Sequence, residues 1–413
     1  MTGWEKHKLV DLTIDGKGHY GIAAPAIDYD EKKFTYLRIT DINDDGTLNI
    51  SGLKSVADPD SRKYLLKEGD IVFARTGNST GRSYYYEPSD GEFVYAGFLI
   101  KFSLDPKKVN PRFLKYYTHS RPYYDWVKSF DTGATRGNIN AQTFGAMEIK
   151  LPPRSVQDRL VEILSSIDHK IALNNRINHN LEEQAQALYK SWFIDFEPFK
   201  VGGFVNSELG MIPKGWCVIK AKDFCPINIG KTPPRKESQW FSSNRDDITW
   251  VSISDMAECG VFLDSSSETL THDAIRSFNI TIVPEGSVLL SFKLTIGRVA
   301  IAGKKLTTNE AIARFITDDS ERTQYLYLTL KNYDYSKLGS TSSIATAVNS
   351  KIIRAMPLIY PGEKVICDFA QVVSSLFGEI RKRQIENKLL TEIRDTILPR
   401  LMSDRLKAVV SDC

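Results

Sequence analysis

The chain has 413 residues, 42% of them hydrophobic and 25% charged, with a formal net charge of +3. This length suffices for two or more domains with separate cores, and the balance is ordinary for a soluble protein, although a mild positive charge alone does not indicate nucleic-acid binding. The five cysteines form no CxxC pair, and no apolar run approaches the roughly 18 residues of a membrane span. We therefore expect a cytoplasmic protein with reduced thiols, no metal site and no membrane segment.

Strand-rich stretches with Gly, Asp and Asn turns alternate along the chain with long helical stretches. We predict an α+β chain with, in order, a first mixed α/β domain at 1–152, a long helix at 153–196, a linker loop at 197–210, a second such domain at 211–361, a second long helix at 362–404 and a tail at 405–413. Strands are expected at 36–42, 71–73, 93–102, 250–253 and 288–292, and shorter helices at 111–120 and 321–332, from their residue content.

The first long helix carries a sustained seven-residue apolar pattern. Apolar residues from 160 to 171 are spaced alternately by four and three, which is the signature of a helix packed along a partner helix. The same pattern recurs 209 residues later. Asn174, Asn178 and Asn387 fall at core positions, where polar residues fix register. Because the intervening linker is too short to return along the helix, we predict an antiparallel coiled coil.

The helices belong to a larger internal repeat. Three pairs of segments match at similar offsets: Tyr36–Ile42 with Trp250–Met256, Gly69–Phe73 with Gly286–Leu290, and Lys101-Phe102 with Arg314-Phe315. A further match joins Ala134-Thr135 to Ala345-Thr346. The drifting offset indicates loops of unequal length on a shared scaffold. Two such units joined by antiparallel helices form a pseudo-twofold repeat, which suits two separated half-sites on a duplex.

Four polar loops edged with Arg and Lys are the candidate binding sites. Arg and Asn or Gln side chains can read guanine and adenine edges, and Lys, Ser and Thr can contact phosphates. The alternative is that each loop is only a solvated turn, but occurrence in both repeats favours function. The candidate DNA-binding residues are Arg75, Thr76, Asn78, Ser79, Thr80 and Arg82, then Arg136 and Asn138, then Lys231, Thr232, Arg235, Lys236 and Gln239, and finally Lys293, Thr295 and Arg298.

The motifs of an intrinsic active site are missing from the sequence. Gly230-Lys231-Thr232 looks like the end of a phosphate-binding loop, but Cys225 stands where its first glycine is needed. We find no methyltransferase tetrapeptide, no dinucleotide fingerprint and no metal-spaced histidine pair. We therefore expect no catalytic residue and no cofactor bound by this chain. The basic run 381–383 is interpreted as a solvated helix face.

The layout resembles the DNA-specificity (S) subunit of type I restriction–modification systems over essentially the whole chain. The segments that carry the resemblance are Ser191–Phe199 with Ser207–Trp216, which match the central part of that family, Ile71–Gly77, Val288–Phe292 with Ile296–Arg298, and Gly230–Arg235 with Trp250–Asp255, which match its recognition domains. The resemblance implies two target-recognition domains separated by two long antiparallel helices.

The resemblance also implies function and partners. The chain would bind a bipartite, asymmetric double-stranded DNA site, one half per domain, and would itself be non-catalytic. It would recruit two modification subunits, which carry S-adenosylmethionine and methylate adenine, and restriction/translocase subunits. Two other hypotheses stay open from the residues: a two-domain coiled-coil scaffold that binds proteins instead of DNA, and a self-sufficient DNA enzyme, whose motifs we do not find.

Overall fold

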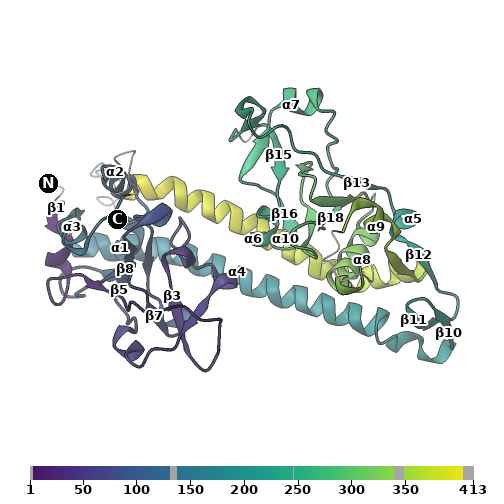
Figure 1. Ribbon diagram of the computed structural model, residues 1–413, viewed down its shortest axis with the longest axis horizontal. Helices are drawn as coiled ribbons and strands as arrows, with labels where there is room; N and C mark the ends of the chain where they lie inside the picture. The colour runs from purple at the N-terminus through teal and green to yellow at the C-terminus, as the bar shows by residue number, and fades with distance from the viewer. Residues whose placement is uncertain (1–2, 131–136, 245, 318, 339–347, 403–413) are drawn as a thin grey trace. The chain divides into compact units, whose positions relative to one another are not determined.

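The computed structural model describes residues 3–130, 137–244, 246–317, 319–338 and 348–402 (Figure 1). The chain forms two compact units: unit 1 comprises Met1–Lys170 with Leu389–Cys413, and unit 2 comprises Ile171–Lys388. This division differs from the predicted one, because each unit takes part of both long helices. Within the described ranges, no helix is long and apolar enough to span a membrane.

The two predicted long helices are present as α4 (Arg154–Phe193) and α10 (Glu363–Leu401). In unit 2 they run in opposite directions, because Asn174 of α4 contacts Asn387 of α10, whereas Phe193 contacts Phe369. The side-chain amide of Asn174 donates to Oδ1 of Asn387 at 2.8 Å and to Glu386 Oε2 at 2.8 Å. In unit 1, Arg394 of α10 donates from Nη1 to Asp168 Oδ1 of α4 at 3.2 Å.

The described residues of unit 1 form three small sheets. The first sheet pairs β1 (Glu5–Lys8) with β9 (Glu148–Leu151). The second has the strand order β2 (His19–Tyr20), β8 (Leu99–Ser103), β5 (Asp70–Ala74) and β6 (Ser83–Tyr85). The third has the order β4 (Lys54–Val56), β3 (Phe34–Leu37) and β7 (Phe93–Tyr95). All pairs are antiparallel except β3 with β7. The shorter helices are α1 (Pro111–Tyr117), α2 (Arg121–Lys128) and α3 (Ala141–Gly145).

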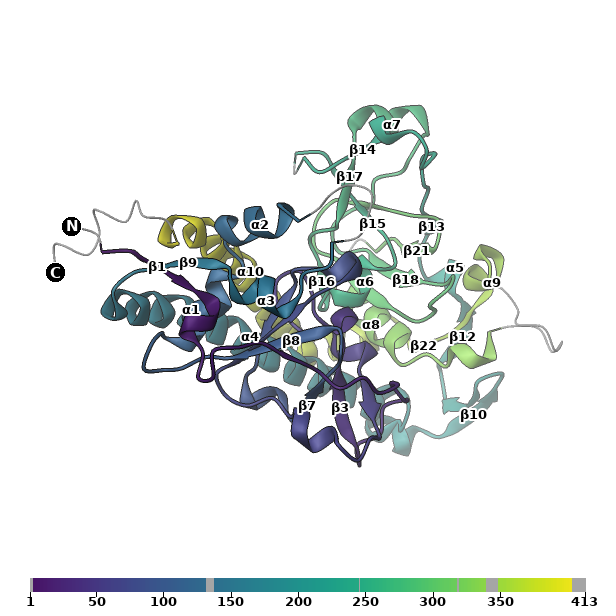
Figure 2. The same cartoon turned by 60° about the vertical axis from the view of Figure 1, so that its left-hand side comes forward.

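Unit 2 repeats this architecture with additions. Its sheets are the hairpin β10 (Phe204–Ser207) with β11 (Gly210–Pro213); β12 (Cys217–Lys220) with β22 (Pro357–Tyr360); β13 (Ile227–Ile229), β21 (Ile312–Phe315), β18 (Val288–Ser291), β19 (Val299–Ala302) and β16 (Phe262–Leu263); and β14 (Phe241–Ser242), β17 (Glu268–Leu270), β15 (Ile248–Val251) and β20 (Thr307–Thr308). Its shorter helices are α5 (Ala221–Phe224), α6 (Asp255–Glu258), α7 (His272–Ser277), α8 (Ser320–Lys331) and α9 (Ser350–Ala355). Helix α7 lies beside the sheet that contains β14 and β17 (Figure 2).

The predicted internal repeat is confirmed strand by strand. The order β2-β8-β5-β6 corresponds to β13-β21-β18-β19, and β4-β3-β7 corresponds to β17-β15-β20, including the one parallel pair in each. Tyr36 of β3 and Trp250 of β15, which match in sequence, are both buried and play the same role. The Tyr36 hydroxyl donates to the Ile22 carbonyl at 2.8 Å, and Trp250 Nε1 donates to the Lys231 carbonyl at 3.1 Å.

One glycine in each repeat lies where the backbones of the two sheets approach most closely. Gly21 follows β2, and Gly230 follows β13. A Cβ atom at Gly21 would lie 2.2 Å from the carbonyl oxygen of Tyr95, and one at Gly230 would lie 1.9 Å from that of Asn309. No other residue fits this approach between the two sheets, because only glycine lacks Cβ. The predicted matches at 134–135 and 345–346 lie outside the described residues.

The core of each unit is completed by helix ends. In unit 1 the start of α4 contributes Leu160, and the end of α10 contributes Leu398 to a cluster with Phe113. In unit 2 the end of α4 contributes Phe193, and the start of α10 contributes Phe369. Each core therefore buries side chains from both long helices, and the apolar helical pattern in the sequence is explained partly by domain packing.

The linker is more ordered than the predicted loop. Residues Glu197–Gly202 form a 3-10 helix and β10 begins at Phe204, pairing with β11. Gly203 and Gly210 adopt φ angles of 77° and 99°, which allow the chain to turn just before β10 and at the first residue of β11. The glycines that led us to predict a loop are the residues that form these turns. The predicted tail at 405–413 lies outside the described residues.

Candidate nucleic-acid interfaces

The loop after β5, residues 75–82, is shaped by glycines and fastened by a threonine. Gly77 and Gly81 have φ angles of 76° and 87°, where most side chains would be strained. The Thr80 hydroxyl lies 2.8 Å from the carbonyl oxygen of Gly77 and 2.9 Å from that of Gly137. Thr80 therefore ties the loop to the segment that carries Asn138, which is exposed.

Arg82 makes its contacts within unit 1. Its Nε donates to Asp44 Oδ1 at 2.7 Å, and its Nη1 donates to the Ile42 carbonyl at 2.9 Å. The guanidinium thus holds the turn that follows β3. Ser79 is buried, with 7% of its surface exposed. DNA binding by Arg82 and Ser79 stays a prediction, and these contacts give Arg82 a structural role as well.

Arg75 lies between two exposed aromatic rings that the sequence reasoning missed. Its guanidinium carbon is 5.2 Å from the ring centre of Tyr20 and 5.8 Å from that of Phe98. Both aromatic residues come from other segments of unit 1: Tyr20 ends β2, and Phe98 precedes β8. Tyr20 and Phe98 each adjoin a glycine. An aromatic residue beside a glycine at a strand end was the sequence signal that could have indicated them.

The other predicted residues of unit 1 differ in exposure. Asn78 is exposed at the tip of the loop, and Thr76 is half-buried at the start of its 3-10 turn. Arg136 lies outside the described residues. Arg75, Asn78 and Asn138 are thus the predicted residues of unit 1 with side chains placed to meet a ligand.

In unit 2, the segment after β13 is held by its own polar side chains. Lys231 Nζ donates to the carbonyl oxygens of Phe278 and Asn279 at 3.2 and 3.0 Å. The Thr232 hydroxyl donates to the carboxylate of Glu310. These bonds join the 231–232 segment to α7 and to the residues after β20, so both side chains shape the surface on which they lie.

Arg235 is stacked on aromatic rings and neutralised. Its guanidinium carbon lies 4.5 Å from the Phe241 ring centre and 4.4 Å from that of Trp250. Its Nη1 donates to both carboxylate oxygens of Glu268, at 2.9 and 2.8 Å. Glu268 is thus a third residue that the search for cations missed, because nothing in the sequence pairs it with a loop 33 residues away.

The remaining predicted residues of this surface are exposed. Lys236 extends into solvent, and Gln239 Nε2 donates to Glu237 at 3.1 Å. In the β18–β19 loop, Lys293 and Thr295 are exposed, and Leu294 between them is 98% exposed with a φ angle of 60°. This loop therefore presents a cation, a hydroxyl and an apolar side chain together.

Arg298 anchors the β18–β19 loop by the same kind of side-chain-to-carbonyl hydrogen bond with which Arg82 anchors the β5–β6 loop. Its Nη1 donates to the Ile253 carbonyl at 2.6 Å, in the turn that follows β15. Its backbone N–H donates to Ser291 Oγ at 3.0 Å. The equivalent arginine in each repeat thus fastens the loop to the turn after the equivalent strand.

Removing the Arg298 side chain should therefore affect folding. Arg298→Ala leaves the Ile253 carbonyl without its charged donor, and we expect it to lower the free energy of unfolding of unit 2 by about 1–3 kcal/mol. Urea denaturation measures the change, with Lys293→Ala as the exposed control, expected within about 0.5 kcal/mol of the parent. Unchanged stability with lost DNA binding would instead make Arg298 a direct DNA contact.

The carboxylate of Glu310 connects two of the predicted loops electrostatically. Burial favours its neutral form, but the hydrogen bond from Thr232 and the charges of Lys293 and Arg235 outweigh burial and lower the pKa of Glu310 below its ordinary value. Glu310 is therefore ionised at neutral pH. A carboxylate at such a surface can accept a hydrogen bond from the amino group of cytosine, so this face offers acceptors as well as donors.

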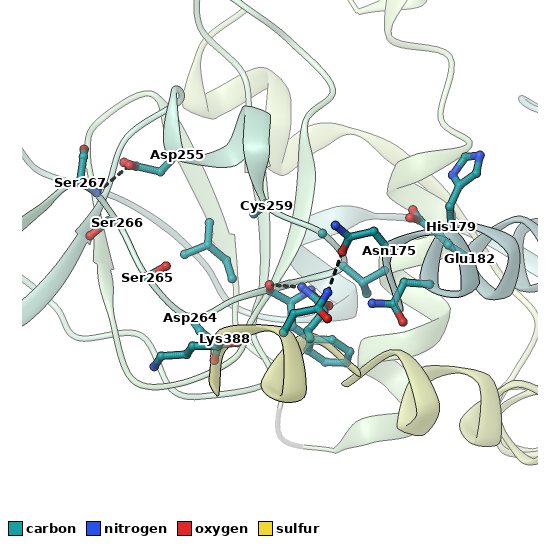
Figure 3. A pocket seen from close by; sticks show the side chains of 17 residues that line it. Asn175, His179, Glu182, Asp255, Cys259, Asp264, Ser265, Ser266, Ser267 and Lys388 are labelled. Atoms are coloured by element: carbon teal, nitrogen blue, oxygen red, sulfur yellow. Dashed lines mark hydrogen bonds between the residues drawn. The ribbon is translucent and has the colours of Figure 1, made fainter. Parts of the chain in front are cut away.

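A polar cavity of about 760 Å³ lies elsewhere in unit 2, where α4 and α10 face residues 255–267 (Figure 3). No predicted DNA-binding residue lines it. Gln384 of α10 enters it and makes two hydrogen bonds to Phe262, each 3.0 Å long, through its amide nitrogen and oxygen. These bonds attach β16 to the helix, so Gln384 serves the packing of the domain on α10.

Arg381 corrects the interpretation of the basic run as a solvated face. Its guanidinium pairs with Asp264 and donates to the Gly303 carbonyl at 2.7 Å. Its side chain is only 24% exposed. In the part of the chain that the structure describes, no group of three or more His, Cys, Asp or Glu residues is placed to hold a metal ion.

Comparison with known proteins decides the family. A family model described as the type I restriction modification DNA specificity domain matches residues 1–183 and again residues 213–391. The chain belongs to this family. The two matches confirm both the resemblance inferred from the sequence and the two-domain repeat, and recognition of a DNA sequence is the role of the family.

Curated relatives and a solved structure agree with this assignment. The chain is 24% identical to the type I restriction enzyme HindI specificity subunit of Haemophilus influenzae, over 98% of this chain and 100% of the relative. It is 28% identical to the MjaIX specificity subunit of Methanocaldococcus jannaschii, over 72% and 70%. The crystal structure of the type I restriction–modification S subunit from M. genitalium shares the fold, with a TM-score of 0.53, 14% identity and coverage of 97% and 96%.

Proposed function

We propose that this chain is the non-catalytic DNA-reading subunit of a type I restriction–modification complex. It binds a bipartite, asymmetric DNA site and reads one half with each recognition domain. The observation that supports this most directly is that one pair of sheets occurs twice, and that a loop with cationic and polar side chains follows the same strand, β5 or β18, in both. The scaffold is shared and the loop residues differ, so the two domains read different sequences.

The long helices serve in this proposal as the spacer between the half-sites. We infer that α4 and α10 form an antiparallel coiled coil along their length. Its support is the pairing of Asn174 with Asn387 in unit 2, where Asn387 Nδ2 also donates to Asn175 Oδ1 at 2.7 Å. Polar residues paired in a helix seam fix one register at a cost in stability. A fixed register keeps the spacer between the two half-sites at one length.

Catalysis belongs to partners in this proposal. Two modification subunits supply S-adenosylmethionine and methylate adenine, and restriction/translocase subunits join the same complex. The chain contributes sequence recognition and a platform for these subunits. Its net charge of +3 is small for a protein that contacts many phosphates, so we infer that the modification subunits supply part of the positive surface around the DNA.

Selection from a random duplex pool tests this function. The full chain in complex with its modification subunits should enrich duplexes with two specified halves separated by a fixed, unspecified spacer. Binding should weaken as salt rises, because phosphate contacts release counterions. Enrichment of no sequence, together with binding that salt leaves unchanged, would refute DNA reading and favour the alternative that the chain is a scaffold for proteins.

A further inference from the structure

We propose that Arg75 reads a guanine in the half-site bound by the first domain, and that Tyr20 and Phe98 hold its guanidinium in the reading position. This inference rests on the proposed DNA-reading function and assigns one residue to one base. Four features of Arg75 support it: an anchored backbone, aromatic neighbours, no carboxylate partner among the described residues, and the engagement of Thr80 and Arg82 in other contacts.

The backbone of Arg75 is fixed on both sides. Its N–H donates to the Phe98 carbonyl at 3.1 Å, and its carbonyl accepts from the N–H of Ile139 at 2.9 Å. Arg75 directly follows β5, a strand buried along its whole length. The Cα position is therefore set by the sheet, as a contact that must meet one base requires.

The side chain is then confined by rings. Its guanidinium carbon lies 5.2 Å from the Tyr20 centre and 5.8 Å from the Phe98 centre. The Tyr20 hydroxyl is itself held, because it accepts from the N–H of Ala141 at 3.1 Å. Arginine stacks favourably on aromatic faces. Confinement before binding lowers the side-chain entropy lost on contact with DNA.

The charge of Arg75 is unpaired within the described part of the chain. Among the residues that the structure describes, no carboxylate pairs with it, and its Nε is buried without a hydrogen-bond acceptor. The stacked arginine of the second domain differs, because Glu268 neutralises Arg235 with two hydrogen bonds. The two terminal nitrogens of Arg75 also form no hydrogen bond within the described chain. They are the donors that match O6 and N7 of guanine.

The surroundings of Arg75 suit a base better than a phosphate. A phosphate site needs several donors, but the Thr80 hydroxyl is used by the Gly77 and Gly137 carbonyls, and Arg82 is used by Asp44. The exposed side chains against which the Arg75 guanidinium lies are instead the rings of Tyr20 and Phe98, at 44% and 55%. Aromatic faces stack on bases, and of these two rings only Tyr20 carries a group, its hydroxyl, that a phosphate could also use.

The test uses the full chain in complex with its modification subunits and the duplexes selected above. Each base pair of the first half-site is changed in turn, and binding is measured for the parent, Arg75→Ala, Arg75→Lys and the exposed control Arg62→Ala. For the parent, replacing one G·C pair should weaken binding by about 5- to 150-fold. Arg75→Ala should abolish this discrimination at that one pair, Arg75→Lys should reduce it because lysine lacks the planar two-donor fork, and Arg62→Ala should preserve it.

Two further measurements separate the alternatives. Phe98→Leu should weaken binding while preserving the preferred base. Arg75→Ala should lower the melting temperature only slightly, because only the stacking of its guanidinium on two exposed rings is lost. Equal weakening of binding to every duplex by Arg75→Ala, with the discrimination at each base pair kept, would show a phosphate contact and overturn the assignment of guanine. Failure of the parent to select any motif would instead refute the proposed function itself, and this inference with it.

Discussion

Replacing Phe193 with alanine is expected to lower the free energy of unfolding of unit 2 by about 3–5 kcal/mol, the usual cost of removing a buried aromatic ring. The ring is 2% exposed at the end of α4. Its centre lies 4.9 Å from that of Phe369, 5.0 Å from that of Tyr325 and 5.7 Å from that of Trp216. The substitution therefore opens a cavity where α4, α8, α10 and the segment after the hairpin meet.

Hydrogen exchange resolves this effect by unit. Amides of β18 in unit 2 should lose protection in Phe193→Ala, and those of β5 in unit 1 should keep theirs. The matched control is Ile194→Ala, because Ile194 is the next residue and 46% exposed, with an expected change within about 0.5 kcal/mol. If Phe193→Ala and Ile194→Ala had equal effects, the aromatic cluster would not hold the helix end in the domain.

Replacing either Gly21 or Gly230 with alanine is expected to destabilise its own unit by about 3 kcal/mol or more, since overpacking of this kind costs at least as much as ordinary core overpacking. The added Cβ would meet backbone carbonyls at 2.2 and 1.9 Å. Backbone cannot yield as a side-chain tip does, so the two sheets of the affected repeat must separate at that point.

The prediction also states that the two glycines play the same role, so that each substitution should affect the corresponding strands of its own unit. Gly21→Ala should reduce hydrogen-exchange protection of β5 and β8, and Gly230→Ala that of β18 and β21. Gly202→Ala serves as the control, because nothing lies within 4 Å of a Cβ at that position. A stable, fully protected Gly230→Ala protein would show that the close approach of the sheets is not required.

The sequence carried enough signal for the repeat because the matched residues are structural. Tyr36 and Trp250 each reach a backbone carbonyl across the same pair of sheets, so an aromatic donor is needed in both places. The long helices were predictable because their apolar spacing has one period. The linker hairpin was missed because glycines are common to loops and to tight turns.

The candidate sites were less predictable, because side-chain partners come from distant segments. A search for cationic loops found Arg75 and Arg298 together, but one faces exposed rings and the other donates to an internal carbonyl. Glu268 and Glu310 belong to the same surface as Arg235 and Thr232, and no local pattern joins them. The sequence gives the positions of the cationic side chains, and only the fold shows which of them are not engaged by other groups of the protein.

Segment exchange tests the central claim that each domain reads one half of a bipartite site. The chain is co-expressed with its modification subunits, and adenine methylation of the host DNA is mapped by sequencing, for the parent and for a chimera in which residues 211–361 come from another family member. We predict a split motif for the parent, and for the chimera a motif with one half changed and the other half and spacer kept. A chimera that changes both halves, or a stable parent complex that yields no methylated motif, would contradict the account.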